Sequence, residues 1–270
     1  MRVTLLGTGT SHGVPAIGCD CAVCHSTDPH DVRTRPSILI DLERAPGRDT
    51  SRGSEVASAV RFVLVDTSTD LRAQALAYDV RRVDAILFTH SHADHIMGLD
   101  EVRRFNAIQQ TPIGCYADER TLGDLRRMFA YVFEPRPRAG GGVPQLSLFH
   151  VGGVFSLGGV EVVPVPLMHG PRPILGFSIG SFAYLTDCNH IPETSWPLIE
   201  GVRTLVLDAL RERTHSTHFS VREALEVVER LRPHRTYFTH ISHDLAHAAT
   251  CARLPDGVEL AYDGLVLETD

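Results

Sequence analysis

The segment FTHSHADHIMG, residues 88–98, carries four metal-type side chains on one short stretch of chain. Apolar residues 85–88 precede the group, and residues 96–99 read as the start of a helix, so we expect a strand-to-helix turn. Imidazole nitrogens and carboxylate oxygens are the usual ligands of zinc and similar catalytic ions. Four such groups on one turn would be costly to bury together without a ligand. We therefore interpret His90, His92, Asp94 and His95 as candidate metal ligands.

Three further candidates stand downstream, each after an apolar run: His169, Asp187 and His240. Sites in α/β sheets form at strand ends, which favours these positions. A lone histidine or aspartate at a strand end is more often structural, so each is a weaker candidate than the four-residue turn.

The run CDCAVC places Cys19, Cys21 and Cys24 close together near the start of the sequence. In a reducing compartment such a cluster more often binds metal than forms disulfides. The remaining cysteines are isolated, and Cys115 lies in an apolar run typical of a small core residue.

The elements that would position these residues recur in both halves of the chain. Strands are expected at 2–7, 37–42, 61–67, 85–90, 112–117, 160–167, 176–187, 204–209, 235–240 and 258–268. Helices are expected at 69–80, 99–108 and 220–233, the last opened by a capping box of Ser220 and Glu223. This alternation predicts a layered α/β sandwich, a single domain over residues 1–270. Segments 43–57 and 134–145 are expected to be surface loops.

The motif THSHADH, with the later His169, Asp187 and His240, resembles the metallo-β-lactamase superfamily. The N-terminal GTGTSHGVPAIGCDCAVC is similar to PhnP-type phosphodiesterases, and the metal motif is also similar to tRNase Z-like nucleases. The resemblance implies an αββα sandwich with two divalent ions, Mn or Zn, in its cleft. It assigns the ligands as follows: His90, His92 and His169 to the first ion, Asp94, His95 and His240 to the second, and Asp187 as the bridge.

The resemblance also implies a structural zinc ion held by Cys19, Cys21, Cys24 and His243. A shell of three cysteines and one histidine is a closed tetrahedral site, which suits structure more than catalysis. The identity of the histidine ligand is left open, because His25 and His247 also lie near the proposed ligands in sequence.

The activity implied is hydrolysis of small phosphodiesters, such as cyclic nucleotides or cyclic ribose phosphates, by a hydroxide that bridges the two ions. Asp94 and His218 are the catalytic candidates, with His218 assisting the leaving oxygen and Asp208 orienting it. His215 is the alternative for that role. Ser11, His12 and His215 are candidate substrate-binding residues, although the glycine-rich loop around Ser11 is equally compatible with a tight turn.

Composition and net charge argue against some other classes of protein. The net charge of −7 argues against stable nucleic-acid binding, and no apolar run approaches the roughly 20 residues that cross a bilayer. We therefore expect a cytoplasmic enzyme acting on a small phosphodiester or nucleotide, with a homodimer left open. The alternatives are a tRNA 3′-processing endonuclease, a thioester or lactone hydrolase on the same fold, and a PqqB-like protein.

Overall fold

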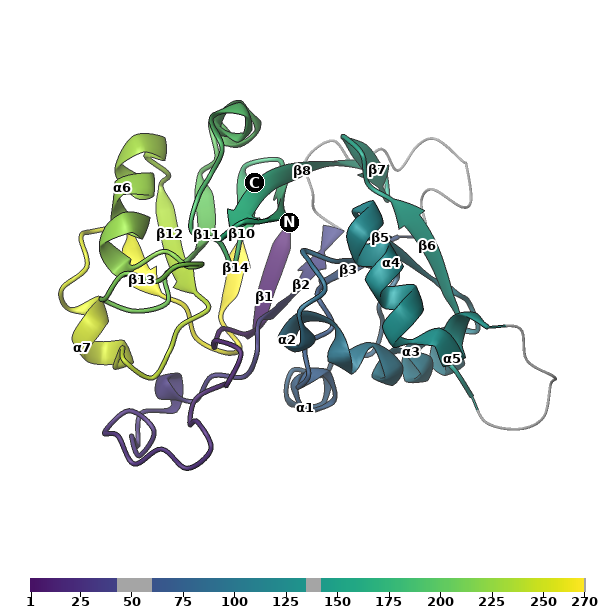
Figure 1. The fold of residues 1–270 in the computed structure, drawn as a ribbon, viewed down its shortest axis with the longest axis horizontal. Coiled ribbons are helices and arrows are strands. Elements are labelled where there is room, and N and C mark those ends of the chain that lie inside the picture. The colour runs from purple at the N-terminus through teal and green to yellow at the C-terminus, as the bar shows by residue number, and fades with distance from the viewer. Residues whose placement is uncertain (43–59, 135–141, 270) are drawn as a thin grey trace.

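The structure is a computed structural model that describes residues 1–42, 60–134 and 142–269. Its described strands form two seven-stranded sheets (Figure 1). The first sheet has the order β14-β1-β2-β3-β4-β5-β6. Its strands are β1 (Arg2–Gly7), β2 (Ser37–Asp41), β3 (Phe62–Val65), β4 (Ala85–Leu87), β5 (Ile113–Ala117), β6 (Leu146–His150) and β14 (Val266–Glu268).

The second sheet has the order β13-β12-β11-β10-β9-β8-β7. Its strands are β7 (Phe155–Leu157), β8 (Val160–His169), β9 (Arg172–Ile179), β10 (Phe182–Leu185), β11 (Thr204–Asp208), β12 (Arg235–Thr239) and β13 (Val258–Leu260). Strands β3, β4, β5 and β6 run parallel to one another, as do β10, β11, β12 and β13, so their carboxyl ends gather at one edge of each sheet.

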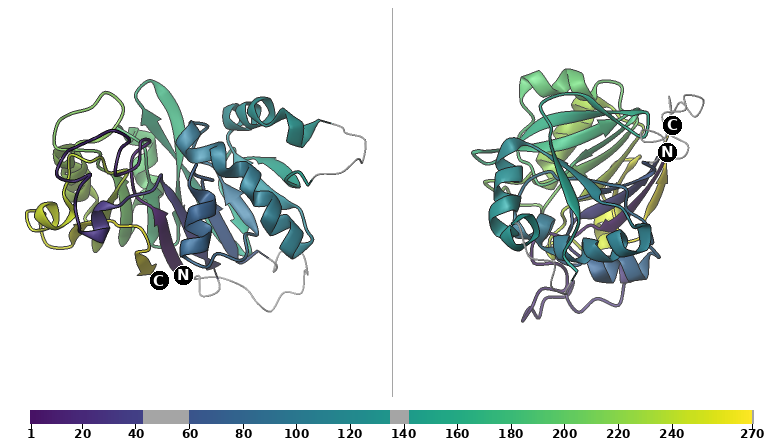
Figure 2. Two further views of the ribbon diagram at one scale, coloured as in Figure 1. Left: turned by 90° about the horizontal axis from the view of Figure 1, so that it is seen from below. Right: turned by 90° about the vertical axis from the view of Figure 1, so that its right-hand side faces the viewer.

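Helices cover the outer face of each sheet, and the sheets lie between the two helical layers (Figure 2). Over the first sheet lie α1 (Leu71–Ala77), α2 (Ala93–Ile96), α3 (Arg103–Gln109), α4 (Glu119–Met128) and α5 (Ala130–Phe133). On the side of the second sheet are α6 (Val221–Leu231) and α7 (His247–Cys251). Short 3₁₀ segments occupy Pro29–Asp31, Met97–Val102 and Glu193–Ile199.

Three apolar clusters fill the spaces between these four layers. The central one joins both sheets, with Val3 and Ile38 from the first packed in one cluster with Phe177 and Val206 from the second. The other two lie between each sheet and its own helices. Burial of these faces on both sides explains the near-continuous apolar strands in the sequence. The predicted α/β sandwich of αββα type is confirmed.

Two predicted strands are each divided in the structure. The segment 176–187 becomes the end of β9 and all of β10, because Gly180 has a φ of 56° and opens a tight reversal that pairs Ile179 with Phe182. The segment 258–268 contributes β13 to one sheet and β14 to the other. The predicted helix 99–108 is a 3₁₀ segment up to Val102 and α-helical only from Arg103.

Helices α4 and α5 and strands β6 and β7 were not anticipated from the sequence. The predicted loop 43–57 lies outside the described residues, as does 135–141 of the predicted loop 134–145. Within the described ranges, no helix is both long and apolar enough to span a bilayer.

Candidate metal centre and active site

The candidate ligands converge because each follows or ends a strand. The turn from His90 to His95 leaves β4, and His169 is the last residue of β8. Asp187 lies two residues beyond β10, and His240 follows β12 directly. Strands from both sheets therefore deliver their terminal side chains to one place.

The backbone is strained at two of these positions, Asp187 and His240, and at a third strand end, Asp66. Asp66, Asp187 and His240 have φ values of 62°, 58° and 59°, in the left-handed region that L-residues other than glycine seldom adopt. Such conformations cluster at functional sites, where the surrounding structure enforces them. Here they occur just after β3, β10 and β12, where the chain turns sharply at the sheet edge.

Asp187 is the centre of the cluster. Six histidine nitrogens lie within 4.0 Å of its carboxylate oxygens, at 2.9 Å (His90), 3.0 Å (His169), 3.1 Å (His218), 3.2 Å (His95), 3.9 Å (His240) and 4.0 Å (His92). His169 Nδ1 also lies 2.9 Å from the Asp187 carbonyl oxygen. One carboxylate thus links rings from both sheets.

Two groups of side chains around Asp187 are compact enough to hold one ion each. The first comprises His90, His92 and Asp187, and the second comprises Asp94, His95, Asp187 and His240. These groups share Asp187, as expected for a bridging ligand. His169 contacts Asp187 but lies outside both groups, and a third grouping joins Asp187 and His240 to Asp208 and His218.

The chemistry of these donors fits divalent cations. In the part of the chain that the structure describes, Nε2 of His90, His95 and His240 and Oδ1 of Asp187 are buried without a hydrogen-bond partner. These four atoms lie close together, but their relative orientation does not allow hydrogen bonds between them. Buried polar atoms in native proteins are nearly always satisfied, and cations bound in the two groups would satisfy these lone pairs.

The protonation states of His90 and Asp187 also suit metal ligands. Burial lowers the pKa of His90 to about 3, so its ring is neutral at pH 7. Burial alone would raise the pKa of Asp187, but His240 and His90 hold it well below its usual range. Neutral imidazole and ionised carboxylate are the forms that bind metal ions.

A second layer of residues fixes two of the rings. His95 Nδ1 lies 2.7 Å from Asp66 Oδ2, and Thr89 Oγ1 lies 3.0 Å from His90 Nδ1. Thr89 also donates its backbone N–H and its hydroxyl to Asp66 at 2.8 Å each. Sequence reasoning missed Asp66, although its place at the end of the apolar run 61–67 resembles that of Asp187.

His218 stands beside the cluster with a carboxylate partner of its own. Its Nδ1 lies 2.9 Å from Asp208 Oδ2 and 3.1 Å from Asp187 Oδ1. Asp208 ends β11, and its Oδ2 also accepts the backbone N–H of Cys188 at 3.1 Å. Burial lowers the pKa of His218 to about 4 and raises that of Asp208. The expected pairing of Asp208 with His218 is therefore present in the structure.

A groove of about 480 Å³ opens from His218 toward the surface. The three candidate substrate-binding residues, Ser11, His12 and His215, all line it. Ser11 and His12 come from the N-terminal loop, and His215 comes from the segment after β11. His215 Nδ1 lies 3.1 Å from the hydroxyl of Thr217 within the same loop.

The three N-terminal cysteines surround His243. Its Nδ1 lies 3.1 Å from Cys19 Sγ, 3.6 Å from Cys21 Sγ and 3.4 Å from Cys24 Sγ. A tetrahedral zinc ion with bonds of about 2.3 Å to sulfur and about 2.0 Å to nitrogen separates these ligands by about 3.6 Å. The backbone N–H of Cys24 lowers the pKa of the Cys21 thiol to about 7, toward the thiolate form that binds metal.

The two alternative histidines lie elsewhere. His25 is exposed and pairs with Asp20 at 3.4 Å. His247 packs against His30 and lies 3.8 Å from Cys251 Sγ. The structure thus brings His243, among the three candidates, to the cysteines.

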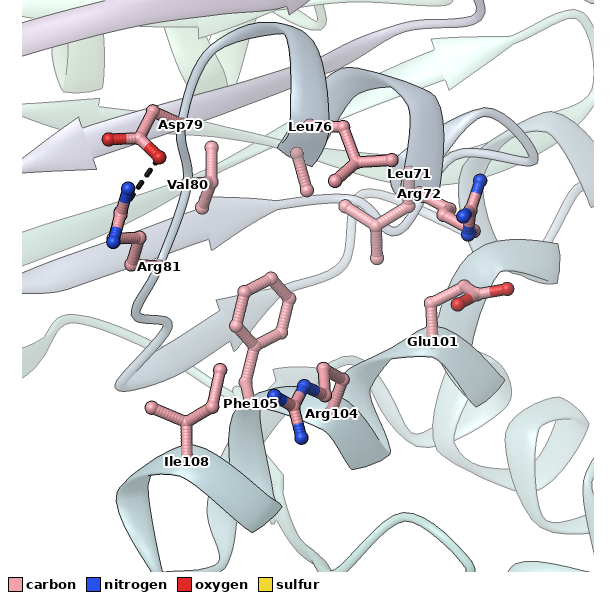
Figure 3. Close-up of a pocket in the computed structure, with 11 residues that line it drawn as sticks. Leu71, Arg72, Leu76, Asp79, Val80, Arg81, Glu101, Arg104, Phe105 and Ile108 are labelled. Carbon is pink, nitrogen blue, oxygen red and sulfur yellow. Dashed lines mark hydrogen bonds and ion pairs between the residues drawn. The ribbon is translucent and has the colours of Figure 1, made fainter.

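A further cavity, of about 320 Å³, lies between α1 and α3. Leu71, Val80 and Phe105 contribute apolar surface to it, and Arg72 and Arg104 lie at its sides (Figure 3). None of its lining residues belongs to either cluster, so we assign it no part in the chemistry of the site.

Comparisons with known proteins agree with this geometry. Residues 61–241 match the family model described as beta-lactamase superfamily domain. A solved structure of a new diphosphatase from the PhnP family has 42% sequence identity and a TM-score of 0.87, covering 100% of this chain and 98% of that one. Zn²⁺-bound PqqB from Methylobacterium extorquens has 20% identity and a TM-score of 0.74, covering 100% of both chains. Human tRNase Z, short form, has 18% identity and a TM-score of 0.65, with 99% of both chains covered.

Among curated proteins, an octanoyltransferase of Porphyromonas gingivalis is 35% identical over 98% of this chain. The alignment covers 51% of that relative, so the chain spans about half the length of the curated relatives it matches. The predicted resemblance to the metallo-β-lactamase superfamily and to PhnP-type proteins is confirmed. The chain belongs to the beta-lactamase superfamily and has the metallo-β-lactamase fold.

Proposed function

We propose that this protein hydrolyses small phosphodiesters with two divalent ions, Mn or Zn, held around Asp187. The observation that supports this most is the Asp187 carboxylate, which lies within 4.0 Å of six histidines contributed by both sheets. Beside it, His218, which is paired with the buried Asp208, lines an open groove.

The proposed residue roles follow from these contacts. His90, His92 and His169 would hold one ion, Asp94, His95 and His240 the other, and Asp187 both. Ions bound there would supply Lewis acidity, which activates water for attack and neutralises charge on the phosphate oxygens. Asp66 and Thr89 would keep His95 and His90 in the orientation that ligation needs.

His218 would act on the leaving group. Its Nδ1 is taken up by Asp208, so Nε2 is the nitrogen left for a departing oxygen, to which it would donate when the ring carries both protons. Since His218 lines the groove, that oxygen would belong to the part of the substrate lying there. Ser11, His12 and His215 would contact the same part.

The match to a PhnP-family diphosphatase supports a phosphoryl substrate, because its identity extends over the whole chain. Hydrolysis of a thioester or lactone is the second candidate, favoured by the octanoyltransferase relative, although that name describes a chain about twice as long. tRNA 3′-processing receives support from the fold only, and the net charge of −7 opposes it.

One substrate panel tests the proposal. The purified protein, loaded with Mn²⁺ or Zn²⁺, is assayed with bis-p-nitrophenyl phosphate, a 2′,3′-cyclic nucleotide, a thioester and a tRNA precursor. The Asp187→Ala variant, prepared in parallel, corrects for contaminating hydrolases. We expect turnover of the two small phosphodiesters. Turnover of the thioester or the tRNA precursor alone would replace the proposal with that alternative.

A further inference from the structure

Ser91 lies between two candidate ligands, His90 and His92, but its hydroxyl hydrogen-bonds to other residues, Asp124 and Arg172. Its hydroxyl donates a short hydrogen bond to the Asp124 carboxylate on α4. It also accepts a hydrogen bond of 2.6 Å from Arg172 Nη2. The backbone between the two histidines is thereby tied to parts of the chain that are remote in sequence.

The partners of Ser91 are themselves linked. Arg172 begins β9, opposite His169 in the β8–β9 register, and its Nη2 lies 3.5 Å from Asp124 Oδ2. Arg127 donates to the other Asp124 oxygen at 2.7 Å. The turn after β4, helix α4 and the β8–β9 hairpin therefore meet at one charged network.

His92 is the ligand that most needs such support. Its side chain is 40% exposed, against 1% for His90 and 0% for His95. His90 and His95 have Thr89 and Asp66 at their second nitrogens. Among the residues that the structure describes, no hydrogen bond holds the His92 ring, which packs against the rings of His90 and His169, so its direction depends strongly on the backbone that carries it.

We propose that Ser91, Asp124 and Arg172 form a positioning network that aims His92 at Asp187 and so sets metal affinity in the His90–His92–Asp187 group. The proposal rests on the metal binding assumed in the proposed function. The network acts on one side of the centre, because the group of Asp94, His95 and His240 receives its support from Asp66.

The expected size follows from other metal sites, where loss of a residue that orients a ligand typically weakens metal binding about 10–100-fold. Ser91→Ala and Asp124→Asn should each weaken one of the two metal-binding steps by that factor. Ser91→Thr keeps the hydroxyl and should restore most of the affinity. Glu119→Gln is the matched control, since Glu119 lies on the same helix and its ion pair among the described residues is with Arg126, at 3.9 Å.

The test is calorimetric titration of metal-free protein with Mn²⁺ alone, with Tm measured on each variant. His92→Ala identifies the affected step, and adding Ser91→Ala to it should cause little further loss because both changes act on the same ligand. Unchanged affinities in Ser91→Ala and Asp124→Asn would overturn the proposal. The proposal would also be overturned if both metal-binding steps weakened equally and the Tm fell in parallel, because that pattern would mean general destabilisation.

These readouts separate the two proposals. If the protein binds two Mn²⁺ ions but hydrolyses no phosphodiester, the proposed substrate class is wrong and the network proposal still stands. If the wild-type enzyme hydrolyses phosphodiesters and the variants bind Mn²⁺ with normal affinity, only the network proposal is overturned. Failure of the wild type to bind divalent ions at all would remove both.

Discussion

The molecule has two clusters of metal-type residues, and they differ in almost every physical respect. The Asp187 cluster is nearly fully buried, mixes histidine with carboxylate and is assembled from strand ends of both sheets. The Cys19–Cys21–Cys24–His243 cluster is half-buried, contains no carboxylate and sits on loops. The first has more donors than one ion needs, whereas the second offers four ligand atoms that lie within 4.8 Å of one another.

Under the proposed function, this difference separates a site that would perform chemistry from one that would hold a loop. Sites that do chemistry keep positions open for substrate, and structural zinc sites are closed. Strained backbone occurs at Asp187 and His240 in the first cluster, while none of Cys19, Cys21, Cys24 and His243 has a positive φ. The groove joins the two, because Cys19 and His243 line it together with His218. Four changes should affect the two clusters differently.

The largest effect is expected from Asp187→Ala, which removes the carboxylate shared by both ion groups. We expect kcat/KM for bis-p-nitrophenyl phosphate to fall by at least about 10⁴-fold, since both ions lose a ligand and the remaining rings lose their common partner. Metal analysis should show loss of at least one divalent ion but retention of one zinc. Wild-type turnover would mean that the bridge lies elsewhere.

His218→Ala should reduce kcat by about 10²–10⁴-fold on a substrate with an alkoxide leaving group and leave metal content intact. The loss should be smaller on p-nitrophenyl esters, because p-nitrophenolate needs little protonation to leave. His215→Ala, the alternative candidate, serves as the comparison. Equal losses on both substrates would point to phosphate positioning, and a larger deficit in His215→Ala would transfer the role.

Cys21→Ser should act on stability more than on chemistry. We expect the loss of one zinc and a Tm lower by about 5–15 °C, as for removal of a native cross-link, with kcat changed less than about 10-fold. Cys251→Ser is the control, since Cys251 lies outside the four-residue cluster. Full zinc content and an unchanged Tm in the Cys21 variant would remove the structural-zinc assignment.

Ser220→Ala should have the smallest effect. Ser220 accepts the Glu223 backbone N–H and completes the capping box of α6, two residues after His218. Loss of the cap should cost about 1 kcal/mol, or a Tm lower by about 2–4 °C in a protein of this size, with both clusters still able to bind metal. If Ser220→Ala also removed catalytic metal, the cluster would depend on α6 as well as on strand ends.

The parts of the site predictable from sequence were those with local signals. The HSHADH turn is contiguous, and His169, Asp187 and His240 each follow an apolar strand, so position in the strand pattern was informative. The sandwich followed from the alternation of strands and helices. The capping box at Ser220 was also a local feature and is present.

What sequence could not provide depended on contacts between distant segments. His25, His243 and His247 are equivalent as residue types, and only folding brings His243 to cysteines more than 200 positions earlier in the chain. The segment 258–268 reads as one strand, but the chain leaves the second sheet after Leu260, and Asp263 then accepts hydrogen bonds from Thr8 and Thr34. The Ser91 network was equally hidden, because a serine between two ligands carries no signal of its own.

The Cys₃His cluster has a consequence for how the chain reaches this fold. His243 is separated from Cys24 by 219 residues, so an ion bound by both closes a loop of most of the chain. In a chain-entropy model a cross-link over that length restricts the unfolded ensemble by about 5 kcal/mol. The three cysteines, however, are neighbours and can bind zinc before folding, which reduces the stabilisation that the ion confers. We therefore expect zinc to bind the three thiolates early in folding and His243 to join as the fourth ligand late. Measurable zinc affinity in an isolated peptide of residues 16–26 would support this order, and its absence would mean that zinc binds only the folded chain.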